Sequence, residues 1–211
     1  MSKKEFINIY DLGGGFLRTE ERAEYYVKAY AQYRRDGFVS TQVLVVKGLL
    51  LTPQGRCYLQ LRSKDKKENA CLVDKTVAGH VAKGVSSNVA FVMECVQELG
   101  VPVCVVSNDE FPSTTNSLDL SIISIVKQLE VVNAFQSERR FLNGEKMIFP
   151  QISVFYIGYF NGPIQFQDGE ASGILSFSRK ELIEEVKANP EKFTKDIVWM
   201  ISRYADEIKA L

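Results

Sequence analysis

The segment from Gly79 to Val101 limits what this chain can fold into more than any other part of the sequence. Residues 73–81 predict a short extended piece that Gly79 breaks. Ser86 or Ser87 can then cap a helix that runs through Leu99, and Gly100 suits the C-terminal stop of that helix. An extended piece, a loop and a helix with both ends marked are therefore expected in this order.

Polar side chains lie on one face of this predicted helix. Residues separated by three or four positions share a helix face, so Glu94, Gln97 and Glu98 are expected to point to one place. Two carboxylates and one amide would meet there, and carboxylate oxygens are ligands that Mg²⁺ prefers. Taken alone, two acids with this spacing are more often a solvated helix face, so the surrounding pattern has to decide.

The elements around this helix predict a mixed sheet with helices packed on it. Residues 43–51 and 57–61 are expected to form a strand hairpin, since Pro53 and Gly55 provide a turn between them. Residues 118–131 are assigned only loosely. The other expected elements are a helix at 19–34, a charged loop at 63–69, a strand at 152–160, a helix at 179–188 capped by Ser178, and a last helix at 193–211.

Composition limits the classes of function. The chain has 211 residues, 45% of them hydrophobic, with 26 basic and 26 acidic side chains. This balance argues against a dedicated nucleic-acid binder. No apolar run approaches the ~20 residues that span a bilayer, so no membrane partner is expected. The four cysteines form no C-x-x-C pair and there is one histidine, which favours the cytoplasm and argues against a zinc site.

The segment 79–101 resembles the Nudix box, whose pattern is G-x5-E-x7-R-E-U-x-E-E-x-G-U with U a bulky aliphatic residue. Without a gap, the matched positions are Gly79, Glu94, Glu98, Gly100 and Val101, and Cys95 occupies an aliphatic position. Three positions depart from the pattern: Val85 replaces a Glu, Met93 replaces the Arg and Gln97 replaces the middle Glu. The box is therefore degenerate.

The three departures have different consequences. In the family, the residues at the positions of Val85 and Met93 form an ion pair, and replacing a buried ion pair by apolar residues is often neutral for stability. Gln97 removes a negative charge from the expected metal site, and an amide cannot act as a general base. The resemblance therefore leaves two alternatives, a weakened hydrolase and a catalytically silent domain that binds a nucleotide-like ligand or a protein.

Other segments resemble the branch of hydrolases similar to isopentenyl diphosphate isomerase. Residues 60–66 match that branch's Q-x-R-S-x-x-K element, residues 79–81 its G-H-V opening, and residues 191–194 its late F-T element. The isomerase has a catalytic Cys directly before the G-H pair, where this chain has Ala78. Isomerase activity is therefore not expected.

The resemblance implies a Nudix-type α/β/α sandwich with a mixed β-sheet, spanning residues 1–211 as one domain with an N-terminal extension of about 1–38. It implies hydrolysis of a phosphoanhydride bond in a nucleoside diphosphate derivative or similar small molecule, with Mg²⁺ or Mn²⁺ as cofactor. The expected metal ligands are Glu94 and Glu98. The expected catalytic residues are Glu94, Glu98 and Glu170, and the expected substrate contacts are Arg62, Lys66, Gly79, His80 and Gly84.

Two points stay open at this stage. Either Glu94 or Glu170 is the group that activates the water, because Gln97 cannot do so. A homodimer is possible, and the sequence does not decide it.

Overall fold

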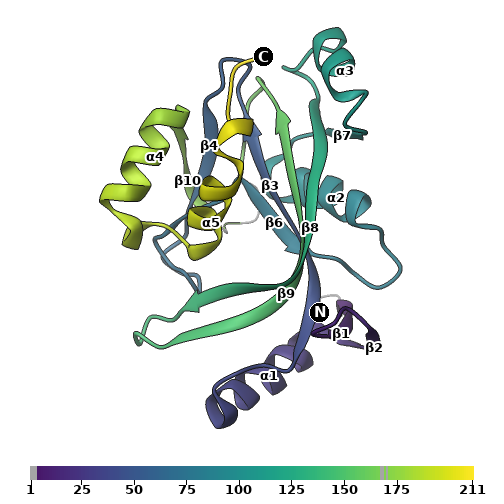
Figure 1. Cartoon of the computed structure of the whole chain (residues 1–211), viewed down its shortest axis with the longest axis vertical. Coiled ribbons are helices and arrows are strands. Elements are labelled where there is room, and N and C mark those ends of the chain that lie inside the picture. Colours follow the sequence, from purple (N-terminus) through teal and green to yellow (C-terminus); the bar gives the residue numbers. More distant parts are fainter. Residues whose placement is uncertain (1–3, 167–168, 170) are drawn as a thin grey trace.

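The structure is a computed structural model, and it describes residues 4–166, 169 and 171–211. Its centre is a mixed sheet in which β3 runs parallel to β9, β9 antiparallel to β8, and β8 parallel to β7 (Figure 1). The strand order is β10-β4-β3-β9-β8-β7. The bounds of these strands are Thr41–Leu51 for β3, Cys57–Arg62 for β4, Val103–Val106 for β7, Ser124–Arg140 for β8, Lys146–Tyr159 for β9 and Ala171–Phe177 for β10.

Helices cover both faces of this sheet. Side chains alternate between the faces along a strand, so Leu49 and Leu51 of β3 pack into the core under helices α4 (Arg179–Ala188) and α5 (Lys195–Tyr204). Val46 and Leu50 pack into the core under α2 (Ser87–Leu99). In Figure 1, α4 and α5 lie on one side of the sheet and α2 on the other. The expected α/β/α sandwich with a mixed sheet is confirmed.

The chain near its start forms more strand than the sequence suggested. Strands β1 (Phe6–Asp11) and β2 (Phe16–Glu21) form a hairpin, and only then does α1 (Arg22–Asp36) begin. The helix expected at 19–34 is thus shifted towards the C-terminus. Gly14, with φ of 93°, provides the turn between the strands. Since β1 also pairs with β3, this segment is hydrogen-bonded into the main sheet.

The long hairpin of β8 and β9 extends beyond the strand expected at 152–160. The loosely assigned residues 118–131 include the start of β8, whose alternation is interrupted by a bulge at Ala134 with φ of 51°. A short helix, α3 (Phe111–Ser117), was not expected. Helix α4 has the predicted bounds and a capping box at Ser178. The last helix is shorter than expected, since α5 ends at Tyr204 and is flanked by two 3₁₀ turns, Pro190–Lys192 and Ala205–Glu207.

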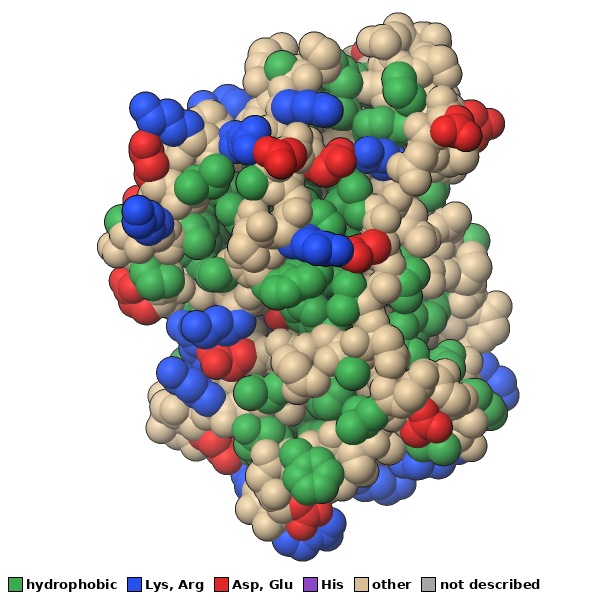
Figure 2. All heavy atoms as spheres, viewed as in Figure 1, with side chains coloured by type: hydrophobic (Ala, Val, Ile, Leu, Met, Phe, Trp, Pro, Cys, Tyr) green, Lys and Arg blue, Asp and Glu red, His purple; other side chains and the backbone are tan. Residues whose placement is uncertain are grey.

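Two very short strands connect β4 to α2 and position the site. Strand β5 (Val73–Asp74) pairs with β4, and β6 (Val77–His80) pairs with β3. No helix in the described part of the chain combines the length and the apolar character that crossing a membrane needs. On the face shown in Figure 2, basic and acidic side chains are interspersed, in keeping with the balanced charge of the sequence.

Candidate active site

Helix α2 forms where its sequence predicts, because both ends are capped by local chemistry. The Ser86 side chain accepts a hydrogen bond from the Val89 N–H, and Gly100 closes the helix in the left-handed conformation with φ of 67°. Phe91, Cys95 and Leu99 are buried against the sheet. The face that carries Glu94 and Gln97 is thereby turned away from this core.

The first glycine of the motif lies directly against its first acid. A Cβ added to Gly79 would overlap the carboxyl carbon and one carboxylate oxygen of Glu94. With Glu94 in this rotamer, a glycine is needed at this point of β6, so Gly79 and Glu94 are adjacent in space although 15 positions apart in sequence. Gly84 adopts φ of +77°, with open space where a Cβ would stand. A side chain there is disfavoured by the backbone conformation rather than by a neighbour.

A cavity of about 1280 Å³ opens in front of this pair. Glu94 and Gln97 line it together with Glu98, whose residue is only 8% exposed. The structure places most of the sequence-predicted site residues around this one cavity; those that line it are Arg62, Lys66, Gly79, His80, Glu94 and Glu98. Gly84 is not among the lining residues, and Glu170 lies outside the described residues.

The acidic side of the cavity fits a divalent cation that also binds phosphate. Glu94 and Glu98 offer two carboxylates, and Gln97 offers a neutral amide oxygen. No group of three or more His, Cys, Asp or Glu side chains with metal-binding geometry occurs among the described residues. Mg²⁺ is usually held by one or two carboxylates, with waters and substrate phosphates completing its shell. With two carboxylates, this site suits a metal ion that the protein and the substrate phosphates hold together better than one held by protein ligands alone.

Val85 and Met93 also line the cavity, and neither is in a dry environment. Val85 is half-buried, and Met93 is 44% exposed. The interpretation that these two residues replace a buried ion pair therefore needs correction. At such exposure, the desolvation cost of a charge at either position is small.

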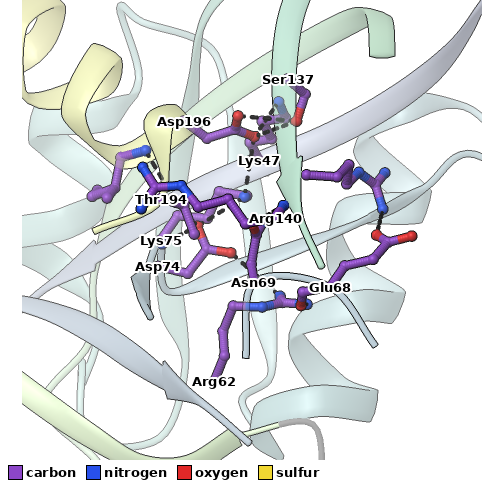
Figure 3. A network of polar contacts seen from close by, with 12 residues as sticks. Lys47, Arg62, Glu68, Asn69, Asp74, Lys75, Ser137, Arg140, Thr194 and Asp196 are labelled. Atoms are coloured by element: carbon purple, nitrogen blue, oxygen red, sulfur yellow. Dashed lines mark hydrogen bonds and ion pairs between the residues drawn. The ribbon is translucent and has the colours of Figure 1, made fainter. Parts of the chain in front are cut away.

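The opposite side of the cavity is formed by a buried network of charges that sequence reasoning missed. Lys47 donates to Asp196 at 2.7 Å, and Lys75 lies 3.0 Å from Asp74 and 3.3 Å from Asp196 (Figure 3). Arg62 lies 3.3 Å from the other Asp74 oxygen. Two hydroxyl groups complete the network, since Thr194 donates to Asp74 at 2.6 Å and Ser137 to Asp196 at 3.0 Å.

Burial and mutual attraction set the protonation of these groups. Burial lowers the pKa of Lys47 to about 8, although Asp196 opposes that shift. Burial would also raise the pKa of Asp196 and Asp74, but the neighbouring ammonium groups hold both below the ordinary range. At pH 7 the two aspartates and Lys75 are thus ionised and Lys47 is mostly protonated, with each lysine facing at least one aspartate.

His80 lies between the two sides of the cavity and is held by helix α1. Burial, together with Arg22 and Arg139, lowers its pKa well below 6.5, so the imidazole is neutral at pH 7. Its Nε2 lies 2.6 Å from the Tyr26 hydroxyl, whose own pKa is raised by burial. The phenol therefore keeps its proton, and Tyr26 and His80 are joined by a hydrogen bond between two neutral groups. Tyr26 is a further lining residue that the sequence did not single out.

Arg62 is held in place, as is the charged loop that follows it. Its guanidinium donates to Asp74 at 3.3 Å and to the main-chain oxygen of Glu68 at 3.1 Å. Glu68 in turn forms an ion pair with Arg139 and accepts from Tyr30. The charged loop expected at 63–69 is thus anchored to β8 and α1, with Arg62 and Lys66 at the cavity.

Comparison with known proteins gives likenesses in structure alone. No model of a known protein family matches the chain, and no curated protein matches its sequence. Among solved structures, DR0079 from Deinococcus radiodurans is 17% identical, covers 94% of this chain and 98% of its own, and has a TM-score of 0.64. The MutT protein from Methanosarcina mazei Go1 is 16% identical, with 79% and 94% covered and a TM-score of 0.51.

A third similar structure is larger than this chain. It is a bifunctional NMN adenylyltransferase/ADP ribose pyrophosphatase from Francisella tularensis, complexed with AMP and a Mn ion. The sequences are 14% identical, the alignment covers 88% of this chain and 47% of that one, and the TM-score is 0.50. At such identities the likeness concerns the fold, and it shows that this chain has a Nudix-type fold.

Proposed function

We propose that this protein is a Nudix-type hydrolase that cleaves a phosphoanhydride bond with the help of Mg²⁺ or Mn²⁺. The observation that carries the proposal is the packing of Glu94 against Gly79 with Glu98 beside it on the cavity wall. The substrate class is a nucleoside diphosphate derivative or a similar small molecule. The sequence resemblance supports placing the protein in the branch of hydrolases similar to isopentenyl diphosphate isomerase. Ala78 at the cysteine position argues against isomerase chemistry.

In this proposal, both sides of the cavity compensate the negative charge of the substrate, one through a metal ion and the other through basic side chains. Glu94 and Glu98 would hold the metal ion, which when bound would neutralise phosphate charge and lower the pKa of a bound water. Arg62 and Lys66 contact phosphate oxygens from the other side, where an arginine fork suits a phosphate. Gly79 allows the main chain to approach closely, and neutral His80 offers a hydrogen bond without adding charge. Glu94 or Glu170 accepts the proton of the attacking water.

A metal-dependent hydrolysis screen tests this function. Purified protein is incubated with a panel of nucleoside diphosphate derivatives, with and without Mg²⁺ or Mn²⁺, and released phosphate is measured after phosphatase treatment. We expect turnover of at least one compound only when metal is present. Binding of a nucleotide without turnover of any compound would favour the rival function, a silent binding domain, which the neutral Gln97 supports.

Replacing Gln97 by Glu separates the enzyme from the silent binder. Because Gln97 is exposed at the cavity beside Glu94 and Glu98, a third carboxylate there should tighten Mn²⁺ binding and add repulsion when metal is absent. We expect Gln97→Glu to melt below wild type without Mn²⁺ and to gain more on its addition, since the ion binds the folded site. An enzyme also gains turnover, whereas a silent binder does not.

The matched control for this variant is Gln136→Glu, which adds the same charge on an exposed strand position away from the cavity. Its Mn²⁺-induced shift in melting temperature should equal that of wild type. If Gln97→Glu also shows the wild-type shift, Gln97 does not lie at the metal, and the alignment of the box loses its support.

A further inference from the structure

The side of the cavity opposite the acidic helix contains a polar atom whose hydrogen bond is missing. The Gln151 residue on β9 is 2% exposed and lines the cavity. Its side-chain oxygen is buried and has no hydrogen-bond partner among the described residues. Buried polar atoms are satisfied in the great majority of cases, so an unsatisfied acceptor at a cavity calls for a donor from water or from a ligand.

Lys47 brings donor groups to the same region. Its ammonium nitrogen lies 3.9 Å from the centre of the Phe135 ring, and Phe135 is the strand partner of Gln151. An ammonium has three N–H groups. In the described part of the chain, Lys47 uses one of them on Asp196, and Lys75 uses two on Asp74 and Asp196. Each lysine therefore retains a donor, and both lysines line the same cavity as Gln151.

The charges of this region favour an uncharged ligand group. Lys47 and Lys75 are balanced by Asp74 and Asp196, and the four side chains are between 1% and 8% exposed. If the ligand carried an anionic group here in addition to its phosphates, that group would lie beside the carboxylates of Asp74 and Asp196. Burying it in this poorly solvated place would cost free energy. Arg62, with 16% of its side chain exposed, adds positive charge farther out, where the proposed phosphate contacts lie.

We propose that Gln151, Lys47 and Lys75 form a subsite for the ribose diol of a nucleoside diphosphate. A hydroxyl group both donates and accepts, so one hydroxyl can donate to Gln151 while its neighbour accepts from an ammonium. Gln151, Lys47 and Lys75 offer no flat aromatic face on which a base could stack, because Lys47 covers the ring of Phe135. A sugar therefore fits this region better than a base. The inference rests on the proposed function, because the diphosphate has to reach the metal side of the same cavity.

Calorimetric binding in the presence of Mn²⁺ tests the subsite with three non-hydrolysable probes. They are α,β-methylene-ADP, its 2′,3′-dideoxy analogue, and methylenediphosphonate, which contains only the diphosphate part. We expect wild type to bind the complete nucleotide about tenfold more tightly than the dideoxy analogue, the scale of one or two hydrogen bonds. Gln151→Leu should lose this preference and bind methylenediphosphonate like wild type.

Ser153→Ala is the matched control. The Ser153 hydroxyl is also buried on β9 without a partner among the described residues, but it does not line the cavity. This variant should bind all three probes like wild type. Equal wild-type affinity for the complete and the dideoxy nucleotide would overturn the subsite, as would a Gln151→Leu variant that weakens methylenediphosphonate equally. If methylenediphosphonate does not bind with Mn²⁺, the proposed function itself fails, and this inference fails with it.

Discussion

Glu98→Gln is expected to lower metal-dependent turnover about a thousandfold while leaving the fold intact. Glu98 and Glu94 are the two box carboxylates at the cavity, and the neutral Gln97 cannot replace either of them. A bound metal contributes several kcal/mol to transition-state stabilisation, and about 4 kcal/mol corresponds to a thousandfold in rate. The measurement is the turnover of the compound found by the substrate screen, over a range of Mg²⁺ concentrations.

Glu184→Gln provides the control for this experiment. It makes the same chemical change at a side chain on α4 that is 66% exposed, and it should retain wild-type turnover. Equal melting temperatures of the two variants in the absence of metal would show that any loss at Glu98 is not a folding defect. Unchanged Mg²⁺-dependent turnover in Glu98→Gln would remove this residue from the metal site.

Asp196→Asn is expected to destabilise the protein by about 3–5 kcal/mol, the usual effect of breaking a buried ion pair from one side. Asp196 is 4% exposed and is the common partner of Lys47, Lys75 and Ser137. Asparagine can still accept from Ser137, but it leaves two buried ammonium groups with only one carboxylate. The free energy of unfolding, measured by urea denaturation at pH 7, checks this value.

The effect of this substitution should depend on pH with a definite sign. The folded-state pKa of Asp196 lies below the ordinary value of 3.8 for an aspartate, despite burial, because Lys47 and Lys75 attract the charged form. Its contribution is therefore complete above pH 4 to 5 and declines as the pH falls further. The difference between wild type and Asp196→Asn should narrow in acid. Asp206→Asn, at a side chain 93% exposed, should stay within about 0.5 kcal/mol of wild type.

A stability loss below about 1 kcal/mol for Asp196→Asn would contradict the buried network. It would mean that water reaches Lys47 and Lys75 and screens their charges. The buried network of charges would then be a solvated surface. The preference of this side of the cavity for an uncharged ligand group would have no physical basis.

The parts of the structure that depend on neighbours in sequence were predictable. The bounds of α2 and α4 follow from caps that act within three or four residues, at Ser86, Gly100 and Ser178. The hairpin of β3 and β4 follows from the turn at Pro53 and Gly55. The resemblance matched Gly79 and Glu94 to positions of one motif, whereas their contact in space came from the structure.

The buried network of charges at the cavity was not predictable in this way, because its residues come from separate elements. Lys47 lies among Val and Leu residues that predict a buried strand, and nothing nearby in sequence reveals its partner 149 positions away. Asp196 reads as an ordinary first-turn acid of a helix. Tyr26 belongs to α1, in the segment expected to be an extension, and this helix reaches His80 through the pairing of β1 with β3 and its packing on Phe149 of β9. Such contacts depend on the register of the whole sheet.

A crystal soaked in MnCl₂ provides the most direct test of the central claim, that α2 supplies a metal site facing the cavity. Manganese is located in an anomalous difference map. The account predicts a peak bounded by the carboxylates of Glu94 and Glu98, close to Gly79, and loss of that peak in a Glu98→Gln crystal soaked in the same way. Manganese bound only elsewhere, with both carboxylates free of metal, would contradict the account.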